Sequence, residues 1–205
     1  MQKKTTVLIF GTFNPVTKAH INMGIQAHQV YPDADVYFVP THRRYLEVDK
    51  RYSDTDILSD KDRLLLLKAA AGEFSFKVCT LEMENKVSGK TYDTVKAMQE
   101  FGDVTVCFGS DNLEQLHEWY RAEELVKENK FLVISRGVSR VKIPESLQQY
   151  SDNFHFENGI FDDVSSTKAR EALRNSDWDT LRKMVPLWVY GYLIAKKDRE
   201  TRGKR

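Results

Sequence analysis

Residues 11–20 of the 205-residue chain, GTFNPVTKAH, combine the residue types that a phosphate-binding turn requires. Gly11 leaves space for a ligand to approach the backbone, and Pro15 stiffens the turn. A helix that begins at Thr17 would direct its unpaired N–H groups and the positive end of its dipole at an anion. The His20 ring and the Thr17 hydroxyl lie at its start and could contact the same anion. The alternative is that Thr17 is only an N-cap and His20 an exposed helical residue.

Two later segments carry side chains suited to nucleotides. Asp111 follows an apolar run, residues 104–109, that ends in glycine as the first strand does. Its carboxylate can accept hydrogen bonds from a ribose hydroxyl, and helix capping is its alternative role. The first turns of a helix expected over residues 165–175 carry three hydroxyls and a guanidinium, which would converge on one anion such as a triphosphate. These side chains belong to Ser165, Ser166, Thr167 and Arg170.

These segments resemble the motifs of one enzyme family. Residues 11–20 resemble the nucleotidyltransferase signature G-x-F-x-P-x-(H/T)-x-x-H. Residues 109–113, GSDNL, with the later Trp119, resemble the G-x-D-x-L…W block of the nicotinate and nicotinamide mononucleotide adenylyltransferases. Residues 164–170, VSSTKAR, resemble their I-S-S-T-x-x-R block. The likeness extends over nearly the whole chain, and the three motifs occur in the family's order.

The resemblance implies an adenylyltransferase of NAD biosynthesis. Its reaction would transfer AMP from ATP to nicotinate or nicotinamide mononucleotide, forming the dinucleotide and pyrophosphate without a protein nucleophile. The enzyme would act by positioning two polyanions and by stabilising charge in the transition state. Mg²⁺ would accompany ATP, held mainly by its phosphates and by water, because the sequence offers no cluster of carboxylates as a metal site.

The resemblance also assigns residues to roles. The catalytic residues would be His20, Thr17 and Arg170. The residues that bind ATP would be Gly11, Thr12, Phe13, His20, Ser165, Ser166 and Arg170. Those that bind the pyridine mononucleotide would be Asn14, Tyr92, Thr94, Asp111, Trp119 and Arg136. Many bacterial members have His at the position of Thr17; Thr is an accepted variant, but it removes a cationic contact and could lower activity or shift substrate preference.

Other interpretations remain open. Tyr92 could pack on the sheet, with Thr91 or Asp93 as the helix cap. Trp119 could cover the sheet edge, as we assume for the two later tryptophans, Trp178 and Trp188. A phosphopantetheine adenylyltransferase or a cytidylyltransferase would share the first motif but would not require Trp119, and a nucleotide-sensing domain would bind ATP without turnover. The sequence does not decide between acid and amide; we favour nicotinate.

Length and charge exclude several classes. The chain suits one domain, residues 1–205, and its formal net charge of +1, from 31 basic and 30 acidic residues, gives no overall field for nucleic acid or membranes. Cys79 and Cys107 lie in predicted buried strands and are expected to be free thiols. No segment is long and apolar enough for a signal peptide or a membrane span, so a soluble cytoplasmic protein is expected. The sequence leaves a homo-oligomer open.

The elements that position these residues alternate between strand and helix. Strands are expected over residues 5–10, 35–40, 74–83, 104–109 and 130–136, with a short edge strand at 153–157. Helices are expected over residues 17–30, 60–72, 91–100, 121–127, 165–175, 178–184 and 186–197. This order predicts a Rossmann-like, doubly wound parallel α/β sheet of order 3-2-1-4-5, with a helical C-terminal portion at about 160–200. The ligand crevice would lie between the first and fourth strands.

Two basic segments have bland alternatives. The loop of residues 41–59 follows the second strand at the edge where such sheets bind ligands, so its basic residues could contact phosphates. A solvated charge run is an equally good interpretation for each of them. They are His42, Arg43, Arg44, Lys50 and Arg51. The basic tail, residues 196–205, is expected to be a frayed and solvated terminus.

Overall fold

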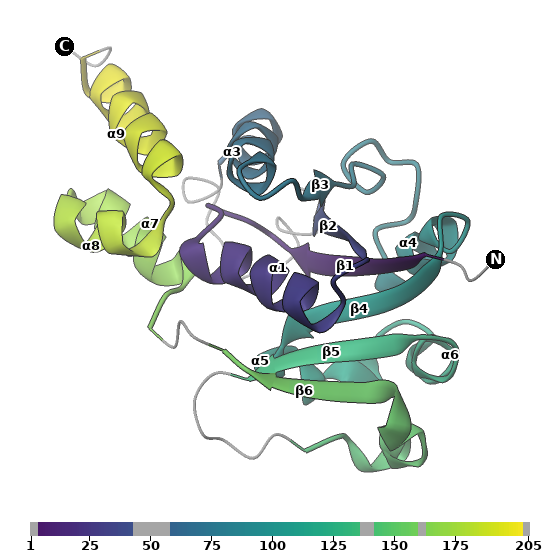
Figure 1. The fold of residues 1–205 in the computed structure, drawn as a ribbon. Coiled ribbons are helices and arrows are strands. Elements are labelled where there is room, and N and C mark those ends of the chain that lie inside the picture. The colour runs from purple at the N-terminus through teal and green to yellow at the C-terminus, as the bar shows by residue number, and fades with distance from the viewer. Residues whose placement is uncertain (1–3, 43–57, 136–141, 160–162, 203–205) are drawn as a thin grey trace.

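A six-stranded parallel sheet runs through the protein, whose computed structural model describes residues 4–42, 58–135, 142–159 and 163–202 (Figure 1). The strand order is β3-β2-β1-β4-β5-β6. The strands are β1 (Thr5–Gly11), β2 (Asp35–Pro40), β3 (Lys77–Val78), β4 (Asp103–Gly109), β5 (Lys130–Ser135) and β6 (Phe154–Asn158). The predicted Rossmann-like class and the order 3-2-1-4-5 are confirmed, and β6 extends the sheet beside β5.

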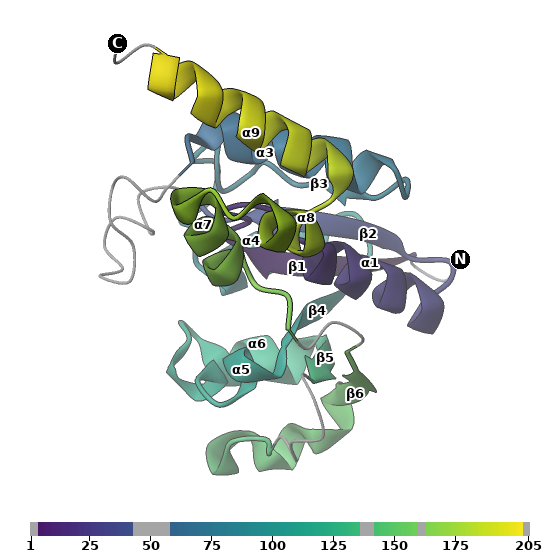
Figure 2. The same cartoon turned by 90° about the vertical axis from the view of Figure 1, so that its left-hand side faces the viewer.

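The central strands are buried on both faces because their apolar side chains enter two separate cores. In β1, Val7 and Ile9 enter one core and Leu8 enters the other. A parallel sheet covered by helices on both faces needs such continuous apolar strands. One face is covered by α1 (Lys18–Val30), α3 (Asp60–Gly72), α7 (Ser166–Asn175), α8 (Trp178–Met184) and α9 (Leu187–Arg202). The other face is covered by α4 (Thr91–Met98), α6 (Ala122–Glu128) and the 3₁₀ helices η2 (Leu116–Glu118) and η3 (Glu145–Asn153) (Figures 1 and 2).

Two helix starts, those of α3 and α7, follow the capping signals in the sequence. The Ser59 side chain accepts a hydrogen bond from the Asp62 N–H at 3.1 Å, so α3 begins as expected. The Ser165 side chain accepts a hydrogen bond from the Lys168 N–H at 3.2 Å at the start of α7. Each cap satisfies one of the N–H groups that a helix start leaves unpaired.

The carboxyl ends of β1, β2 and β4 meet at one edge of the sheet. The register pairs Ile9 with Cys107 and Gly11 with Pro40. The next elements, α1 after β1 and the short α5 (Ser110–Leu113) after β4, begin at this edge. This is the edge where open parallel sheets bind ligands.

The expected third strand, residues 74–83, is mostly wrong, because only Lys77–Val78 pair with β2. Ser75 adopts a left-handed backbone conformation, with a φ of 59°, which interrupts an extended chain. Residues 80–86 form turns whose hydrogen bonds are local, such as that from the Lys86 N–H to the Leu81 carbonyl at 2.9 Å. Cys79 therefore lies after the strand rather than within it, although both cysteines are buried free thiols.

Two smaller expectations and one alternative interpretation were also wrong. Trp188 is 68% exposed at the start of α9, so it does not cover the core. The N-cap of α4 is Lys90, so the alternative interpretation of Thr91 or Asp93 as the cap does not hold. The tail is not frayed at its beginning, because α9 continues to Arg202.

Gly102 allows the loop before β4 to pass close to the N-terminal strand. A Cβ at Gly102 would lie 1.9 Å from the Lys4 carbonyl oxygen, so Gly102→Ala must displace backbone and should destabilise the fold by about 3 kcal/mol. Gly72 is the matched control: nothing lies within 4 Å of its Cβ position, and Gly72→Ala in α3 should stabilise by roughly 0.5–1 kcal/mol. Urea unfolding measures the free energy of unfolding of both variants. Equal stabilities for the two variants would contradict the close approach.

Candidate active site

The turn between β1 and α1 packs its aromatic side chain inside the protein. The Phe13 ring is fully buried and lies edge-on to the rings of His20 and Phe38, at centroid distances of 5.0 Å and 5.6 Å. A Cβ at Gly11 would lie 3.0 Å from the Phe13 ring, so this ring fills the space that the glycine leaves. The φ of Phe13 is 46°, a left-handed conformation that costs roughly 1 kcal/mol or more for a residue with a Cβ. The surrounding contacts must hold the turn in this form.

Helix α7 is bonded to the same turn, which brings two predicted anion-binding helix starts together. Arg170 Nη1 donates to the Asn14 carbonyl at 2.9 Å, and Ser166 Oγ donates to the Pro15 carbonyl at 2.9 Å. The Asn14 side chain is fully buried and accepts a hydrogen bond from the Leu58 N–H at 2.9 Å. The starts of α1 and α7 therefore lie side by side at the end of β1.

His20 and Thr17 hydrogen-bond to each other at the start of α1. His20 Nδ1 lies 3.0 Å from both the Thr17 backbone nitrogen and Thr17 Oγ1. A backbone N–H can only donate, so Nδ1 accepts this bond, and in the neutral ring Nε2 carries the proton. The donor that His20 can offer to an anion is therefore Nε2–H. Thr17 is fully buried, and its contacts orient the His20 ring.

Several side chains of the predicted triphosphate site at α7 hydrogen-bond to other groups of the protein. The Ser165 side chain caps the helix, and Arg170 Nη2 donates to Thr167 Oγ1 at 3.2 Å. Lys168, on an exposed turn, forms an ion pair with Asp163 at 3.0 Å. Arg170 thus braces the signature turn in this structure, and its contact with ATP stays a prediction.

At the end of β4, Asp111 is exposed and Trp119 is half-buried. A Cβ at Gly109 would lie 2.5 Å from Asp111 Oδ1, so the glycine lets this carboxylate lie close to the strand end. The Trp119 ring contacts the Phe108 ring edge-on, with 5.6 Å between centroids. Part of Trp119 therefore belongs to the core, and the remainder is open to solvent.

Tyr92, at the start of α4, is a buried aromatic residue under charged neighbours. Its side chain is 6% exposed, and the Arg121 guanidinium lies 4.3 Å from its ring centroid. Its hydroxyl lies 3.5 Å from Glu124 Oε2, at the limit of a hydrogen bond. These contacts match the packing role considered for Tyr92, and its contact with a pyridine ring stays a prediction.

Thr94 hydrogen-bonds to a buried carboxyl group that the sequence did not reveal. Thr94 is fully buried, and its hydroxyl donates to Glu82 Oε1 at 2.9 Å. Burial raises the pKa of Glu82 to about 7, and the Thr94 hydrogen bond only partly opposes that rise. Glu82 lies in the segment wrongly expected to be a strand, which is why it was missed; its position between the apolar residues Leu81 and Met83 was the available signal.

Several residues considered as ligand contacts lie outside the described residues. They are Arg136 and the basic residues Arg43, Arg44, Lys50 and Arg51. Of the basic loop, His42 is described, and it is partly exposed after β2.

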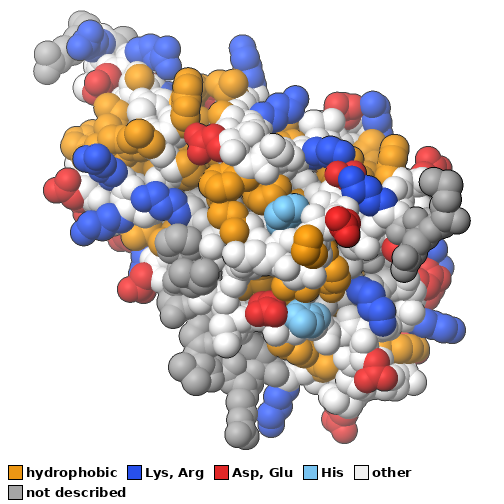
Figure 3. Space-filling model, in the orientation of Figure 1, with side chains coloured by type: hydrophobic (Ala, Val, Ile, Leu, Met, Phe, Trp, Pro, Cys, Tyr) orange, Lys and Arg blue, Asp and Glu red, His pale blue; other side chains and the backbone are white. Residues whose placement is uncertain are grey.

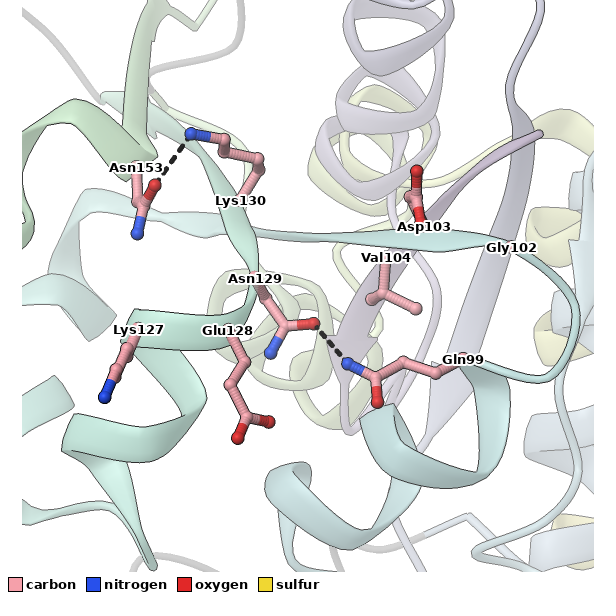
Figure 4. A pocket seen from close by; sticks show the side chains of 9 residues that line it. All are labelled: Gln99, Gly102, Asp103, Val104, Lys127, Glu128, Asn129, Lys130 and Asn153. Carbon is pink, nitrogen blue, oxygen red and sulfur yellow. Dashed lines mark hydrogen bonds between the residues drawn. The ribbon is translucent and has the colours of Figure 1, made fainter. Parts of the chain in front are cut away.

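A cavity of about 550 Å³ lies at the opposite, amino-terminal edge of the sheet, at the starts of β4 and β5 (Figure 4). Its polar side chains bond to one another: Gln99 Nε2 donates to Asn129 Oδ1 at 3.1 Å, and Lys130 Nζ donates to Asn153 Oδ1 at 2.7 Å. None of the predicted site residues lines it. The candidate site is therefore the carboxyl edge, not this cavity.

Acidic and basic side chains are interspersed on the face drawn in Figure 3, in keeping with the net charge of +1. Within the described ranges, no group of three or more His, Cys, Asp or Glu side chains is placed to hold a metal ion. No helix in those ranges combines the length and apolar character needed to cross a membrane.

Comparison with known families gives one match over most of the chain. The model of the family described as cytidylyltransferase-like matches residues 8–172. A probable nicotinate-nucleotide adenylyltransferase of Staphylococcus haemolyticus (strain JCSC1435) is 29% identical over 198 residues, which cover 94% of this chain and 95% of the relative. One of Caldicellulosiruptor saccharolyticus is also 29% identical over 198 residues, covering 93% and 96%.

Solved structures with the same fold include a parasite enzyme. The structure of Plasmodium falciparum nicotinic acid mononucleotide adenylyltransferase complexed with APC has a TM-score of 0.73 at 21% identity and covers 95% of this chain and 96% of that one. The same enzyme complexed with NaAD has a TM-score of 0.71 at 22% identity, covering 94% and 96%. At these identities the likeness establishes the fold.

The buried Glu82 carboxyl should make stability fall as pH rises from about 4.5 to about 7. The unfolded chain releases this proton near 4.5, the ordinary pKa of a glutamate, and the folded chain only near 7, so neutral Glu82 is favoured in the fold. Glu82→Gln keeps an acceptor for Thr94 without a charge. Its stability relative to the natural protein should therefore rise across this window by at most roughly 3 kcal/mol.

Urea unfolding at a series of pH values tests this expectation. Glu84→Gln is the control, because exposed Glu84 pairs with Lys86 and its pKa is lowered. Removing that carboxylate should give no gain between pH 4.5 and 7. A pH-independent difference between Glu82→Gln and the natural protein would contradict the burial of an ionisable carboxyl.

Proposed function

The chain belongs to the cytidylyltransferase-like family, and from that premise we propose that it transfers AMP from ATP to nicotinate mononucleotide, forming the dinucleotide and pyrophosphate. The observation that carries the proposal is the junction of the α1 and α7 starts at the end of β1, where His20 also lies. Two helix starts bonded together offer N–H groups and dipoles to a polyphosphate.

The reaction needs no nucleophile from the protein. A phosphate oxygen of the mononucleotide attacks the α-phosphorus of ATP, and the bond from that phosphorus to the pyrophosphate oxygen breaks. Negative charge accumulates on the transferred group and on the leaving pyrophosphate. Preorganised donors that face this charge lower the barrier. We assign that task to Nε2–H of His20 and to the amides of the two helix starts.

Nicotinate is favoured over nicotinamide as the acceptor because two relatives that match at least 93% of this chain are probable nicotinate-nucleotide adenylyltransferases. We also propose that Mg²⁺ arrives with ATP. The ion would be held mainly by the phosphates of ATP and by water. When bound, it would supply positive charge to the phosphates.

Pyrophosphate release from ATP and Mg²⁺ tests the proposal. Nicotinate mononucleotide, nicotinamide mononucleotide and phosphopantetheine are offered separately, and the dinucleotide is identified by mass. We expect the highest kcat/KM with nicotinate mononucleotide. Turnover with phosphopantetheine alone would assign the chain to another branch of the family, and ATP binding without turnover on any acceptor would indicate a sensor.

His20→Asn separates the two nitrogens of the His20 ring. The Asn side chain can place an oxygen near the position of Nδ1, which keeps the acceptor for the Thr17 N–H, but it removes the donor at Nε2. We expect kcat to fall by roughly 100-fold or more, as for loss of one transition-state donor, with a small fall in melting temperature because the ring contact with Phe13 is lost. His20→Ala should lose both the activity and some stability. Near-normal turnover of folded His20→Asn would show that Nε2 does not act on the reacting groups.

Trp119→Ala should weaken binding of the pyridine mononucleotide about tenfold, or roughly 1.4 kcal/mol, because the exposed part of the ring would stack on the pyridine. Some stability is also lost with the Phe108 contact. Trp178→Ala in α8 is the control: it too removes a partly buried indole from a core cluster, and it should lower stability without changing mononucleotide affinity. Isothermal titration measures the affinities for ATP and for the mononucleotide. Equal losses of ATP and mononucleotide affinity in Trp119→Ala would mark Trp119 as core.

A further inference from the structure

Arg63, in the first turn of α3, is a fully buried arginine without a role in the site described so far. A buried guanidinium is costly unless its donors are paired. Its Nη1 donates to the Thr12 carbonyl at 2.6 Å. Its Nη2 donates to the Thr41 carbonyl at 2.7 Å and to Asp60 Oδ1 at 2.7 Å. Its Nε is buried and has no hydrogen-bond partner within the described part of the chain.

The two carbonyl groups belong to the ends of two neighbouring strands. Thr12 follows β1 and Thr41 follows β2. The Thr41 N–H also donates to the Gly11 carbonyl at 3.0 Å, which continues the pairing of the two strands by one bond. Arg63, on α3, therefore links the carboxyl ends of β1 and β2. Charge-assisted hydrogen bonds of this kind are roughly twice as strong as neutral ones.

The contact with Thr12 determines the direction of one peptide group. In a trans peptide, the carbonyl and the following N–H point in opposite directions. With the Thr12 carbonyl on Arg63, the Phe13 N–H points away from α3. Phe13 is also in the left-handed conformation, so rotation of this peptide could relieve its strain. That rotation would turn the Thr12 oxygen toward the anion side of the turn, and the bond to Arg63 opposes it.

We propose that Arg63 is a positioning residue, which fixes the Thr12–Phe13 peptide so that the Phe13 N–H, and not the Thr12 carbonyl, faces the phosphates of a bound nucleotide. The identity of that nucleotide, ATP, rests on the proposed function. Arg63 does not touch the nucleotide. Its effect on turnover passes through the backbone of the turn.

Hydrogen–deuterium exchange of the ligand-free protein tests whether Arg63 fixes the conformation of the turn. In Arg63→Met, which keeps most of the side-chain length but has no donors, peptides from residues 11–20 should exchange roughly tenfold faster, while β4 and β5 stay at the natural rate. In the turnover assay, kcat should fall roughly tenfold or more while the KM for the mononucleotide stays within about twofold. Arg63→Lys has one donor group, which can reach one carbonyl, so its exchange rate and its kcat should lie between those of Arg63→Met and the natural protein.

Asp60→Asn is the matched control, because it removes the charge of one Arg63 partner and leaves both carbonyl contacts in place. It should keep natural exchange in residues 11–20 and a kcat within about twofold of the natural value. If Arg63→Met does not fold, Arg63→Lys carries the comparison with Asp60→Asn. Natural exchange in residues 11–20, a uniform rise across the sheet, or equal losses in both variants would overturn the proposal. A natural protein inactive on every acceptor would overturn the proposed function, and the ligand-free exchange would still decide the role of Arg63.

Discussion

The direction of three backbone carbonyl groups after β1 is the constraint on which the site depends. Close to a polyphosphate, a carbonyl oxygen repels and an N–H attracts, so a turn that binds anions must direct its carbonyls elsewhere. Here the carbonyls of Thr12, Asn14 and Pro15 accept hydrogen bonds from Arg63, Arg170 and Ser166, respectively. The turn is local in sequence, but its conformation is set by α3 and α7, which follow it at large separations.

Most of the fold could be predicted because it is written in local patterns. The uncharged apolar runs of β1 and β4 require two covered faces, and the residues Ser59 and Ser165 mark helix starts by satisfying free N–H groups. The third strand was overestimated because extended structure depends on a partner as well as on composition. There, a left-handed Ser75 and the local turns after Thr80 leave only two residues paired with β2.

The site could be predicted only in part. Motif spacing located the turn, His20 and the start of α7, and topology placed Asp111 at the same edge. Burial was not readable, because Arg63 stands among charged residues at a helix start and its carbonyl partner Thr12 lies 51 residues away. Likewise, the partner of the Thr94 hydroxyl is a buried carboxyl in a segment whose conformation was misjudged.

The C-terminal helix α9 bonds to both helices that hold the turn. On α3, Asp62 accepts hydrogen bonds from Tyr192 at 2.5 Å and Lys196 at 2.9 Å. Burial alone would raise the pKa of Asp62, but these bonds keep it below its usual value, so the charged pair is retained at neutral pH. On α7, Lys197 donates to the Leu173 carbonyl at the helix end, where a cation is favoured by the dipole. Because α3 carries Arg63 and α7 carries the other two donors, α9 fixes the spacing between the groups that orient the turn. The residues expected to begin a frayed tail are therefore part of the support of the site.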